Sequence, residues 1–190
     1  MKIILASQSP RRRELLGLMG LTDFAIIPAQ GEEDLSAGLP PDKLVEALAA
    51  AKAKEVAAQA DPSDVIIAAD TIVTLDGKVL GKPHSGEEAF EMLRILSGRT
   101  HRVYTGVAVL QGQRLELLHE ATEVVFRPLT EGEISRYIAT GEPMDKAGAY
   151  GIQGRGALLV EGIRGDYFNV MGLPVCRLGQ MLKAFGIVTL

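Results

Sequence analysis

The feature that most restricts the fold is an uninterrupted apolar run, Val65–Ala69, which Asp70 follows directly. The run is too short for a helix and rich in valine and isoleucine, so it predicts a strand at the centre of a sheet. An acidic residue at the end of a central strand is a frequent location for a general base or a metal ligand. The alternative is an aspartate that only caps a turn.

The remaining pattern predicts an α/β fold. Strands alternate with helices early in the chain, whereas hairpins dominate the middle, where Asp76-Gly77 is a strong turn signal. This order favours a mixed sheet over a doubly wound parallel one. We expect helices at Pro10–Met19, Pro41–Ala60, Gly86–Leu96, Thr130–Thr140 and Leu173–Phe185. We expect strands at Lys2–Ala6, Phe24–Ile27, Val65–Ala69, Thr71–Leu75, Lys78–Leu80, Arg102–Leu110, Leu115–Phe126 and Ala157–Ile163.

Length and charge exclude several classes of protein. The 190 residues predict one domain over residues 1–190, with room for two lobes around a central cleft. The net charge of −4 argues against a protein that binds nucleic acid. The longest stretch without a charge, Val103–Gln113, is far shorter than the roughly 20 residues of a membrane helix. A single cysteine excludes an internal disulfide, and no signal peptide is visible, so we expect a cytoplasmic protein without a membrane partner.

The first predicted helix has an unusual start, because Ser9-Pro10 is followed by Arg11, Arg12 and Arg13. Serine suits the N-cap and proline the first helical position. Acidic side chains usually occupy this turn, and each cation there costs about 0.3–1 kcal/mol. A bound anion would reverse the sign of that cost, and backbone N–H groups with guanidinium groups suit phosphate. The alternative is a solvated basic turn.

A second unusual residue is Lys52. On a helical wheel it falls inside the apolar stripe of Leu44 and Leu48, whereas Lys43 and Lys54 fall on the opposite side. A lysine in such a stripe needs an anionic partner, unless its side chain extends past the stripe to solvent.

Two glycine-containing segments are also candidates for a site. Lys82 stands between Gly81 and Pro83, where the backbone is closely specified. Asp145–Gly154 contains three glycines in a short polar stretch, and the amide of Gln153 could both donate to and accept from a nucleobase. Ordinary connecting loops are the alternative for both segments.

Several common motifs are missing from the sequence. It has no P-loop, no dinucleotide fingerprint and no serine-hydrolase elbow. The three histidines, His84, His101 and His119, lack the spacing of metal ligands, so we expect them at the surface or in hairpins.

Taken together, these segments resemble the Maf-type nucleoside triphosphate pyrophosphatases, historically described as septum-formation inhibitor proteins. The matching segments span nearly the whole chain in the family's order. They are Leu5–Arg12, Lys52, Ala69–Val73, Gly81–Pro83, Ser97-Gly98 with His101, and Asp145–Gly154.

The resemblance implies a bent mixed sheet with flanking helices that form a cleft, related to inosine triphosphate pyrophosphatases. It also implies hydrolysis of a nucleoside triphosphate to the monophosphate and pyrophosphate, a divalent cation such as Mg²⁺ or Mn²⁺, and a homodimer. By position, Asp70 would be the proton acceptor and would share the metal with Glu33. The phosphate-side residues would be Ser9, Arg12, Lys52 and Lys82, and the residues that select the substrate would be Arg11, Thr71 and Gln153.

The same resemblance indicates which base is bound. A branch that acts on 7-methyl-GTP has tryptophan at the position of Arg11 and glutamate at that of Gln153. A methylated guanine is cationic, so an aromatic face and a carboxylate attract it, whereas Arg11 would repel it. A neutral Gln153 amide can pair with uracil or thymine. We therefore expect dTTP and UTP as substrates, with a role in nucleotide pool sanitation.

Two alternatives remain at this point. One is a pyrophosphatase that prefers another nucleotide, such as 7-methyl-GTP. The other is a nucleotide-binding regulator of cell division with little turnover. Asp70 and Glu33 argue against the regulator, because acids beside a triphosphate weaken binding unless they hold a metal.

Overall fold

The computed structural model describes residues 1–31, 35 and 38–189. Within these residues the chain forms a seven-stranded sheet, in which six strands have the order β2-β1-β3-β5-β6-β7 and β4 pairs with β3. The strands are β1 (Ile3–Leu5), β2 (Ala25–Ile26), β3 (Val65–Leu75), β4 (Lys78–Leu80), β5 (Thr100–Gln111), β6 (Arg114–Phe126) and β7 (Val160–Arg164). The helices are α1 (Pro10–Leu18), α2 (Pro41–Ala57), α3 (Gly86–Leu96), α4 (Glu131–Ile138), α5 (Tyr167–Met171) and α6 (Val175–Lys183).

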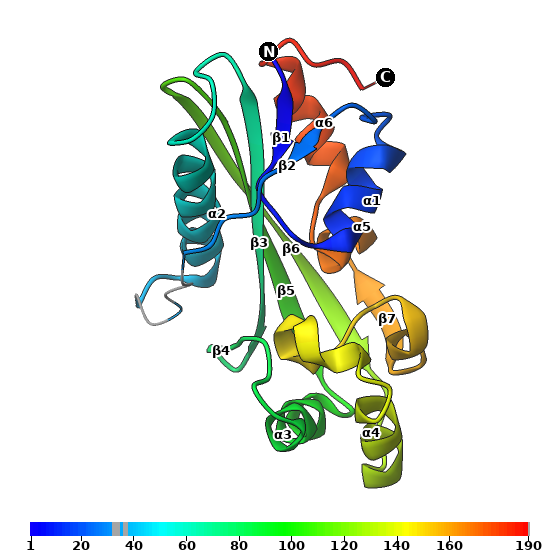
Figure 1. Ribbon diagram of the computed structural model, residues 1–190. Helices are drawn as coiled ribbons and strands as arrows, with labels where there is room; N and C mark the ends of the chain where they lie inside the picture. The colour runs from blue at the N-terminus through cyan, green and yellow to red at the C-terminus, as the bar shows by residue number, and fades with distance from the viewer. Residues whose placement is uncertain (32–34, 36–37, 190) are drawn as a thin grey trace. The chain divides into compact units, whose positions relative to one another are not determined.

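The sheet is mixed. Strand β1 pairs in parallel with β2 and β3, whereas β4 is antiparallel to β3 and β7 is antiparallel to β6. Helices lie beside the strands of the sheet (Figure 1). The predicted α/β fold class with a mixed sheet is therefore confirmed.

The chain divides into two compact units. Unit 1 comprises Met1–Asp70, Thr105–Glu120 and Gly172–Leu190, and unit 2 comprises Thr71–Tyr104 and Ala121–Met171. Strands β3, β5 and β6 each contribute residues to both units. The predicted cleft between lobes stays a prediction.

Unit 1 buries both faces of its strands. The apolar residues of α2 pack on one face of β1, β3 and β5, and α1 and α6 lie on the other side of these strands (Figure 1). The first cluster contains Ile4, Ala6, Ala49, Ala53, Val56, Ile66, Ala68, Ala108 and Leu110. The alternate residues Leu5, Ile67 and Ala69 are fully buried as well. Because successive side chains of a strand point to opposite faces, burial of both faces explains the uninterrupted apolar run.

Helix α2 approaches β5 at a glycine. A Cβ atom added to Gly106 would lie 2.2 Å from the backbone oxygen of Val45 and 2.7 Å from the nitrogen of Glu46. No side chain fits between two backbones at that separation, so Gly106 sets how closely α2 lies on the sheet.

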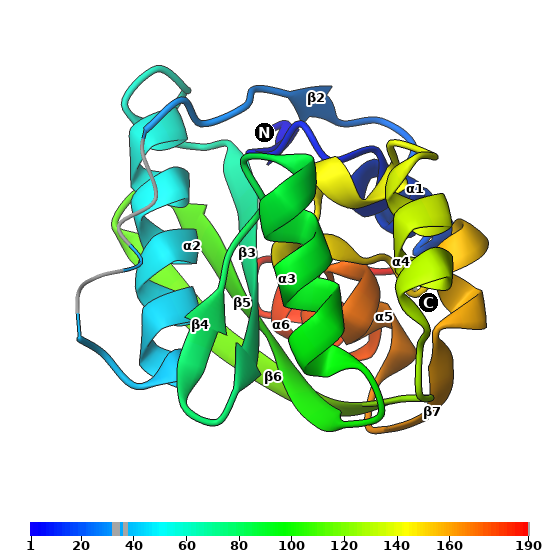
Figure 2. The same cartoon turned by 90° about the horizontal axis from the view of Figure 1, so that it is seen from below.

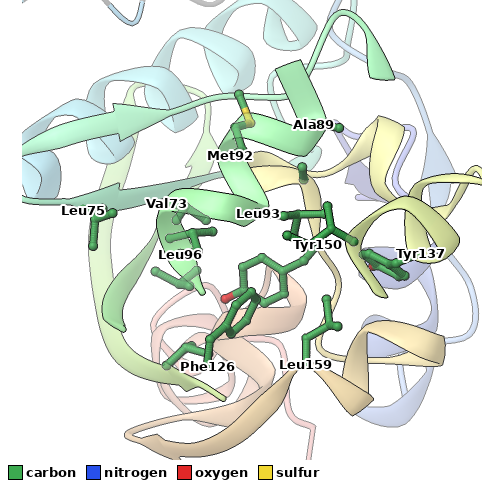
Figure 3. Close-up of a cluster of buried hydrophobic side chains, with 14 residues drawn as sticks. Val73, Leu75, Ala89, Met92, Leu93, Leu96, Phe126, Tyr137, Tyr150 and Leu159 are labelled. Carbon is green, nitrogen blue, oxygen red and sulfur yellow. The ribbon is translucent and has the colours of Figure 1, made fainter. Parts of the chain in front are cut away.

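Unit 2 has its own apolar core. Helices α3 and α4 pack together, and β4 forms a short hairpin with the end of β3 (Figure 2). Between these elements the rings of Phe126 and Tyr150 meet edge to face at 4.7 Å between centroids, beside Tyr137 and Leu159 (Figure 3).

His101 belongs to this core. It was expected at the surface or in a hairpin, and the structure corrects the surface alternative. The imidazole is 2% exposed, its Nε2 atom lies 2.7 Å from the hydroxyl oxygen of Tyr150, and it meets Phe126 edge to face. Burial lowers the pKa of His101 to about 4, because a charged imidazolium would lose its hydration there. The ring is therefore a neutral hydrogen-bonding partner inside an aromatic cluster.

The predicted elements differ from the structure in several places. Strand β3 continues without interruption from Val65 to Leu75, so Asp70 lies inside a strand and not at its end. The expected strand at Ala157–Ile163 begins only at Val160, because a 3₁₀ helix covers Gly154–Leu158. The short helix α5 was not predicted. Among the helices of the described residues, none has the length and apolar character that crossing a membrane requires.

The contact at Gly106 predicts a strong effect of a single methyl group. Gly106→Ala should lower the free energy of unfolding by about 1–3 kcal/mol, because α2 must move away from β5. Gly17→Ala is the matched control, since nothing lies within 4 Å of its added Cβ atom and alanine favours a helix. Urea denaturation of both variants measures the difference. A Gly106→Ala variant as stable as the wild type would contradict the close approach.

Candidate functional site

The centre of the candidate site is an ion pair between Lys52 on α2 and Asp70 on β3. The Nζ atom of Lys52 donates a short hydrogen bond to Oδ1 of Asp70. The side chain of Lys52 is 17% exposed and that of Asp70 only 4%. Each buried charge therefore has the other as a close partner, as charges removed from water require.

The pattern along α2 explains why Lys52 is held there. Leu44, Leu48 and Lys52 recur every four residues, so they share one side of the helix, and both leucines are buried. Lys54 lies on the exposed side, as the helical wheel predicted. Asp70 continues the alternation of Ile66 and Ala68, which face α2 in the same cluster. The inward direction predicted for Lys52 is confirmed, and its partner is the aspartate that the sequence singled out separately.

A second group of polar residues lies at the start of α1 in the same unit. Ser9 is the N-cap, and its hydroxyl accepts a hydrogen bond of 3.5 Å from the amide of Arg12. The guanidinium of Arg12 donates from Nε to the Gly172 carbonyl at 2.9 Å and from Nη1 to the Ser7 hydroxyl at 3.1 Å. The first turn contains no acidic residue. Arg12 is thus fixed at the positive end of a helix, where an anion would be stabilised.

The neighbouring arginines differ in exposure. Arg11 is half-buried, whereas Arg13 is exposed. Only Arg11 and Arg12 therefore belong to the partly enclosed surface at this helix start.

Three residues predicted for the site, Thr71, Lys82 and Gln153, belong to unit 2. Thr71 follows Asp70 on β3, so its side chain points to the opposite face of that strand. Lys82 is exposed between β4 and α3, and Gln153 is half-buried between two 3₁₀ segments. The amide of Gly148 donates to the carbonyl of Gly81 at 3.0 Å, so the loop before Gln153 lies against the segment that carries Lys82. How these three residues lie relative to the ion pair stays a prediction.

The metal ligands were predicted to be Asp70 and Glu33, and Glu33 lies outside the described residues. The segment just before it is attached to α2, because the Glu55 carboxylate accepts the amides of Gln30 at 2.6 Å and Gly31 at 3.0 Å. Glu55 lies three residues after Lys52 on the same helix. Among the described residues, no group of three or more His, Cys, Asp or Glu side chains is arranged to hold a metal ion.

Two contributors were missed by the sequence analysis. Ser7 is buried and contacts Arg12, and it also accepts the amide of Ser9 at 3.2 Å. The sequence signal that could have indicated Ser7 is its place two residues before Ser9, the N-cap of α1. Glu142 binds the backbone amides of Arg155 and Gly156, which follow Gly154. No sequence motif predicts this role, because the two amides are 13 and 14 residues away from Glu142.

Chemically, the described part of the site combines an enclosed carboxylate with fixed cations. The carboxylate can accept a proton, and the cations with the helix start can stabilise a phosphate. This combination suits hydrolysis of a phosphoanhydride.

Comparison with known proteins gives the family. The family described as Maf-like protein matches residues 2–185. A dTTP/UTP pyrophosphatase from Moorella thermoacetica is 56% identical over 98% of this chain and 96% of its own length. One from Bacillus velezensis is 53% identical over 98% and 97%. A solved HAM1 protein from Coxiella burnetii is 20% identical, with a TM-score of 0.48 over 66% of this chain and 73% of that chain.

The Lys52–Asp70 pair predicts coupled effects on stability. Lys52→Met should lower the free energy of unfolding by about 1–3 kcal/mol, because it removes a charged partner from the buried Asp70 carboxylate. The double variant Lys52→Met/Asp70→Asn should lose less than the sum of the two single losses. Urea denaturation measures all three variants.

Lys54→Met is the matched control, since Lys54 is exposed on the same helix, and it should change stability little. Strictly additive losses in the double variant would show that the two side chains do not interact.

Proposed function

Because the chain belongs to the Maf-like protein family, we propose that it is a nucleoside triphosphate pyrophosphatase that hydrolyses dTTP and UTP. The products are the nucleoside monophosphate and pyrophosphate, and the cellular role is sanitation of the nucleotide pool. The observation that carries the chemistry is the enclosed ion pair of Lys52 and Asp70.

Asp70 is the proton acceptor in this proposal. Hydrolysis requires a water oxygen to attack phosphorus while the bond between the α- and β-phosphates breaks and pyrophosphate leaves. The attacking water must lose a proton, and the Asp70 carboxylate is the acidic group of the described site that can take it. Lys52 compensates the carboxylate charge before the substrate binds, and its ammonium group can turn to a phosphate oxygen afterwards. General base assistance of this kind is worth about 10²–10⁴ in rate.

The phosphate side is assigned to the start of α1 and to two lysines. A triphosphate carries about four negative charges at neutral pH, so several cations are needed to balance them. Ser9 and Arg12 offer a helix start and a fixed guanidinium, and Lys52 and Lys82 add two ammonium groups. These charges lower the barrier most if they match the charge that develops as pyrophosphate leaves.

Base selection is assigned to Arg11, Thr71 and Gln153. An amide side chain can pair with the alternating carbonyl and N–H edge of uracil or thymine, since it both donates and accepts. The positive charge of Arg11 disfavours a cationic base such as N7-methylguanine.

A divalent cation fits the residues that are present. Mg²⁺ in phosphate-processing sites is usually held by one or two carboxylates and by the phosphates of the substrate, and it does not require a complete protein cage. Asp70 and Glu33 would supply the carboxylates, and Glu55 attaches the segment leading to Glu33 one helical turn beyond Lys52. When bound, the cation offsets charge on the phosphates. The identity of the metal, a homodimer and a cytoplasmic location belong to the proposal as expectations.

A panel of nucleotides tests the proposal. We expect kcat/KM to be highest for dTTP and UTP, lower for CTP and GTP, and lowest for 7-methyl-GTP, with Mg²⁺ or Mn²⁺ present. Products must be resolved, because pyrophosphate without free phosphate distinguishes this reaction from stepwise removal of phosphate. Tight nucleotide binding without turnover would favour the regulator instead.

The variant Arg11→Trp/Gln153→Glu tests the assignment of base selection. It should narrow or invert the preference for dTTP over 7-methyl-GTP, because it removes a repulsive charge and adds an aromatic face and a carboxylate. Arg13→Trp is the matched control at an exposed position of the same turn and should leave the preference unchanged. A wild-type preference for 7-methyl-GTP would contradict the proposed substrate.

A further inference from the structure

The loop that carries Gln153 is attached on both sides by two side chains outside it. Gln153 lies between the end of the Asp145–Tyr150 stretch and the 3₁₀ helix Gly154–Leu158. Its own backbone is extended, with φ −94° and ψ 173°. Gln153 belongs to no helix or strand, so its position depends on the contacts on either side.

Before Gln153 the contact is with Tyr137, at the end of α4. The phenol oxygen of Tyr137 accepts the amide hydrogen of Gly151 at 3.2 Å. The same hydroxyl donates to Oε1 of Glu142 at 3.0 Å. Tyr137 is only 4% exposed and belongs to the core of unit 2 (Figure 3), so its hydroxyl is a fixed point for the loop.

After Gln153 the contact is with Glu142. Its Oε2 atom accepts the amide of Arg155 at 3.0 Å and its Oε1 atom accepts the amide of Gly156 at 3.0 Å. The side chain of Gln153, the N-cap residue of the following 3₁₀ helix, makes no capping hydrogen bond. The carboxylate of Glu142 caps that helix in its place.

The charge of Glu142 is stabilised where it lies. Partial burial alone would raise the pKa of Glu142, but the hydrogen bonds from the amides of Gly156 and Arg155 and from Tyr137 outweigh burial and hold that pKa below its ordinary value. The charged groups near it are the ammonium of Lys146, which donates to the Glu142 carbonyl, and Asp145, which pairs with Lys146 at 2.6 Å. The carboxylate is therefore ionised, and a strong acceptor, at neutral pH.

Two of the residues that approach Glu142 and Tyr137 are glycines, and a larger side chain at either position would collide with these contacts. A Cβ atom at Gly154 would lie 2.8 Å from Oε2 of Glu142, and Gly154 has φ +64°. A Cβ atom at Gly156 would lie 2.0 Å from the Gly151 carbonyl and 2.7 Å from the Tyr137 hydroxyl. The loop thus closes on itself around Gln153, and only glycine allows the approach at both positions.

We infer that Glu142 and Tyr137 are positioning residues for base selection: together they fix the backbone on both sides of Gln153 and so set where its amide can meet a pyrimidine. The inference rests on the proposed function. Neither side chain needs to touch the substrate. An amide that pairs with a base edge must be held within a fraction of an ångström, and a displacement of about 1 Å can cost up to about 10²-fold in rate.

The test is the selectivity of two conservative variants. Glu142→Gln keeps the shape of the side chain but replaces one accepting oxygen by an amide donor that faces a backbone N–H group. Tyr137→Phe removes only the hydroxyl. In both variants the ratio of kcat/KM for dTTP to kcat/KM for CTP should fall by about tenfold. The ratio should fall mainly because KM for dTTP rises, since contacts to the base are made equally in the bound substrate and in the transition state.

Glu133→Gln is the matched control. Glu133 is a carboxylate of the same unit that accepts the amide of Thr130 at 2.8 Å and contacts Arg127, and it completes the cap at the start of α4. Its loss should lower the melting temperature but leave the dTTP/CTP ratio unchanged. Adding Glu142→Gln to Gln153→Ala should produce no further loss of selectivity, because the positioned amide is already gone.

The outcomes separate the inference from the proposed function. If the wild type does not prefer dTTP and UTP, the proposed function fails. If the wild type prefers them and Glu142→Gln and Tyr137→Phe keep its dTTP/CTP ratio while their melting temperatures fall, the two residues are structural and the inference is overturned. If Glu142→Gln does not fold, Tyr137→Phe alone decides in the same way.

Discussion

The candidate site of unit 1 depends on the ion pair between Lys52 on α2 and Asp70 on β3. Both residues occupy positions that their neighbours fill with apolar side chains, Leu48 on the helix and Ala68 on the strand. A buried charge is tolerated only when an opposite charge reaches it, and α2 lies close to the sheet because Gly106 adds no side chain between them. The fold therefore holds a carboxylate out of bulk water with a cation beside it.

The remaining candidate residues differ in how firmly the protein fixes them. Arg12 is held by Ser7 and by the Gly172 carbonyl, and Ser9 caps the same helix. These contacts orient the guanidinium of Arg12 at the positive end of α1, where an anion would be stabilised. Gln153 is fixed indirectly, through the backbone on either side of it. The phosphate charges are thus balanced by cations and a helix start, whereas base selection relies on a glycine-rich loop whose backbone is fixed by hydrogen bonds.

The sequence was sufficient where a short pattern determines the outcome. The apolar run at Val65–Ala69 required a sheet covered on both faces, and the helical wheel placed Lys52 inward and Lys54 outward. It was insufficient where distant residues decide. Asp70 was expected at a strand end because it follows the apolar run directly. The strand instead continues through Asp70, and Lys52, a distant residue in sequence, compensates its charge there. His101 was expected at the surface or in a hairpin, and it is instead buried against Tyr150 and Phe126, which are far away in sequence. Glu142 escaped notice because backbone amides, which carry no sequence signal, are its partners.

The most direct test of the central claim, that Asp70 accepts a proton from water beside a bound triphosphate, is the variant Asp70→Asn. The amide keeps the shape of the side chain but loses its charge and basicity. We predict an unchanged circular dichroism spectrum, nucleotide binding that is retained or tighter because a negative charge near the phosphates is gone, and a fall in kcat for dTTP of at least about 10²-fold. A variant that folds, binds dTTP and keeps more than about a tenth of the wild-type kcat would contradict the account.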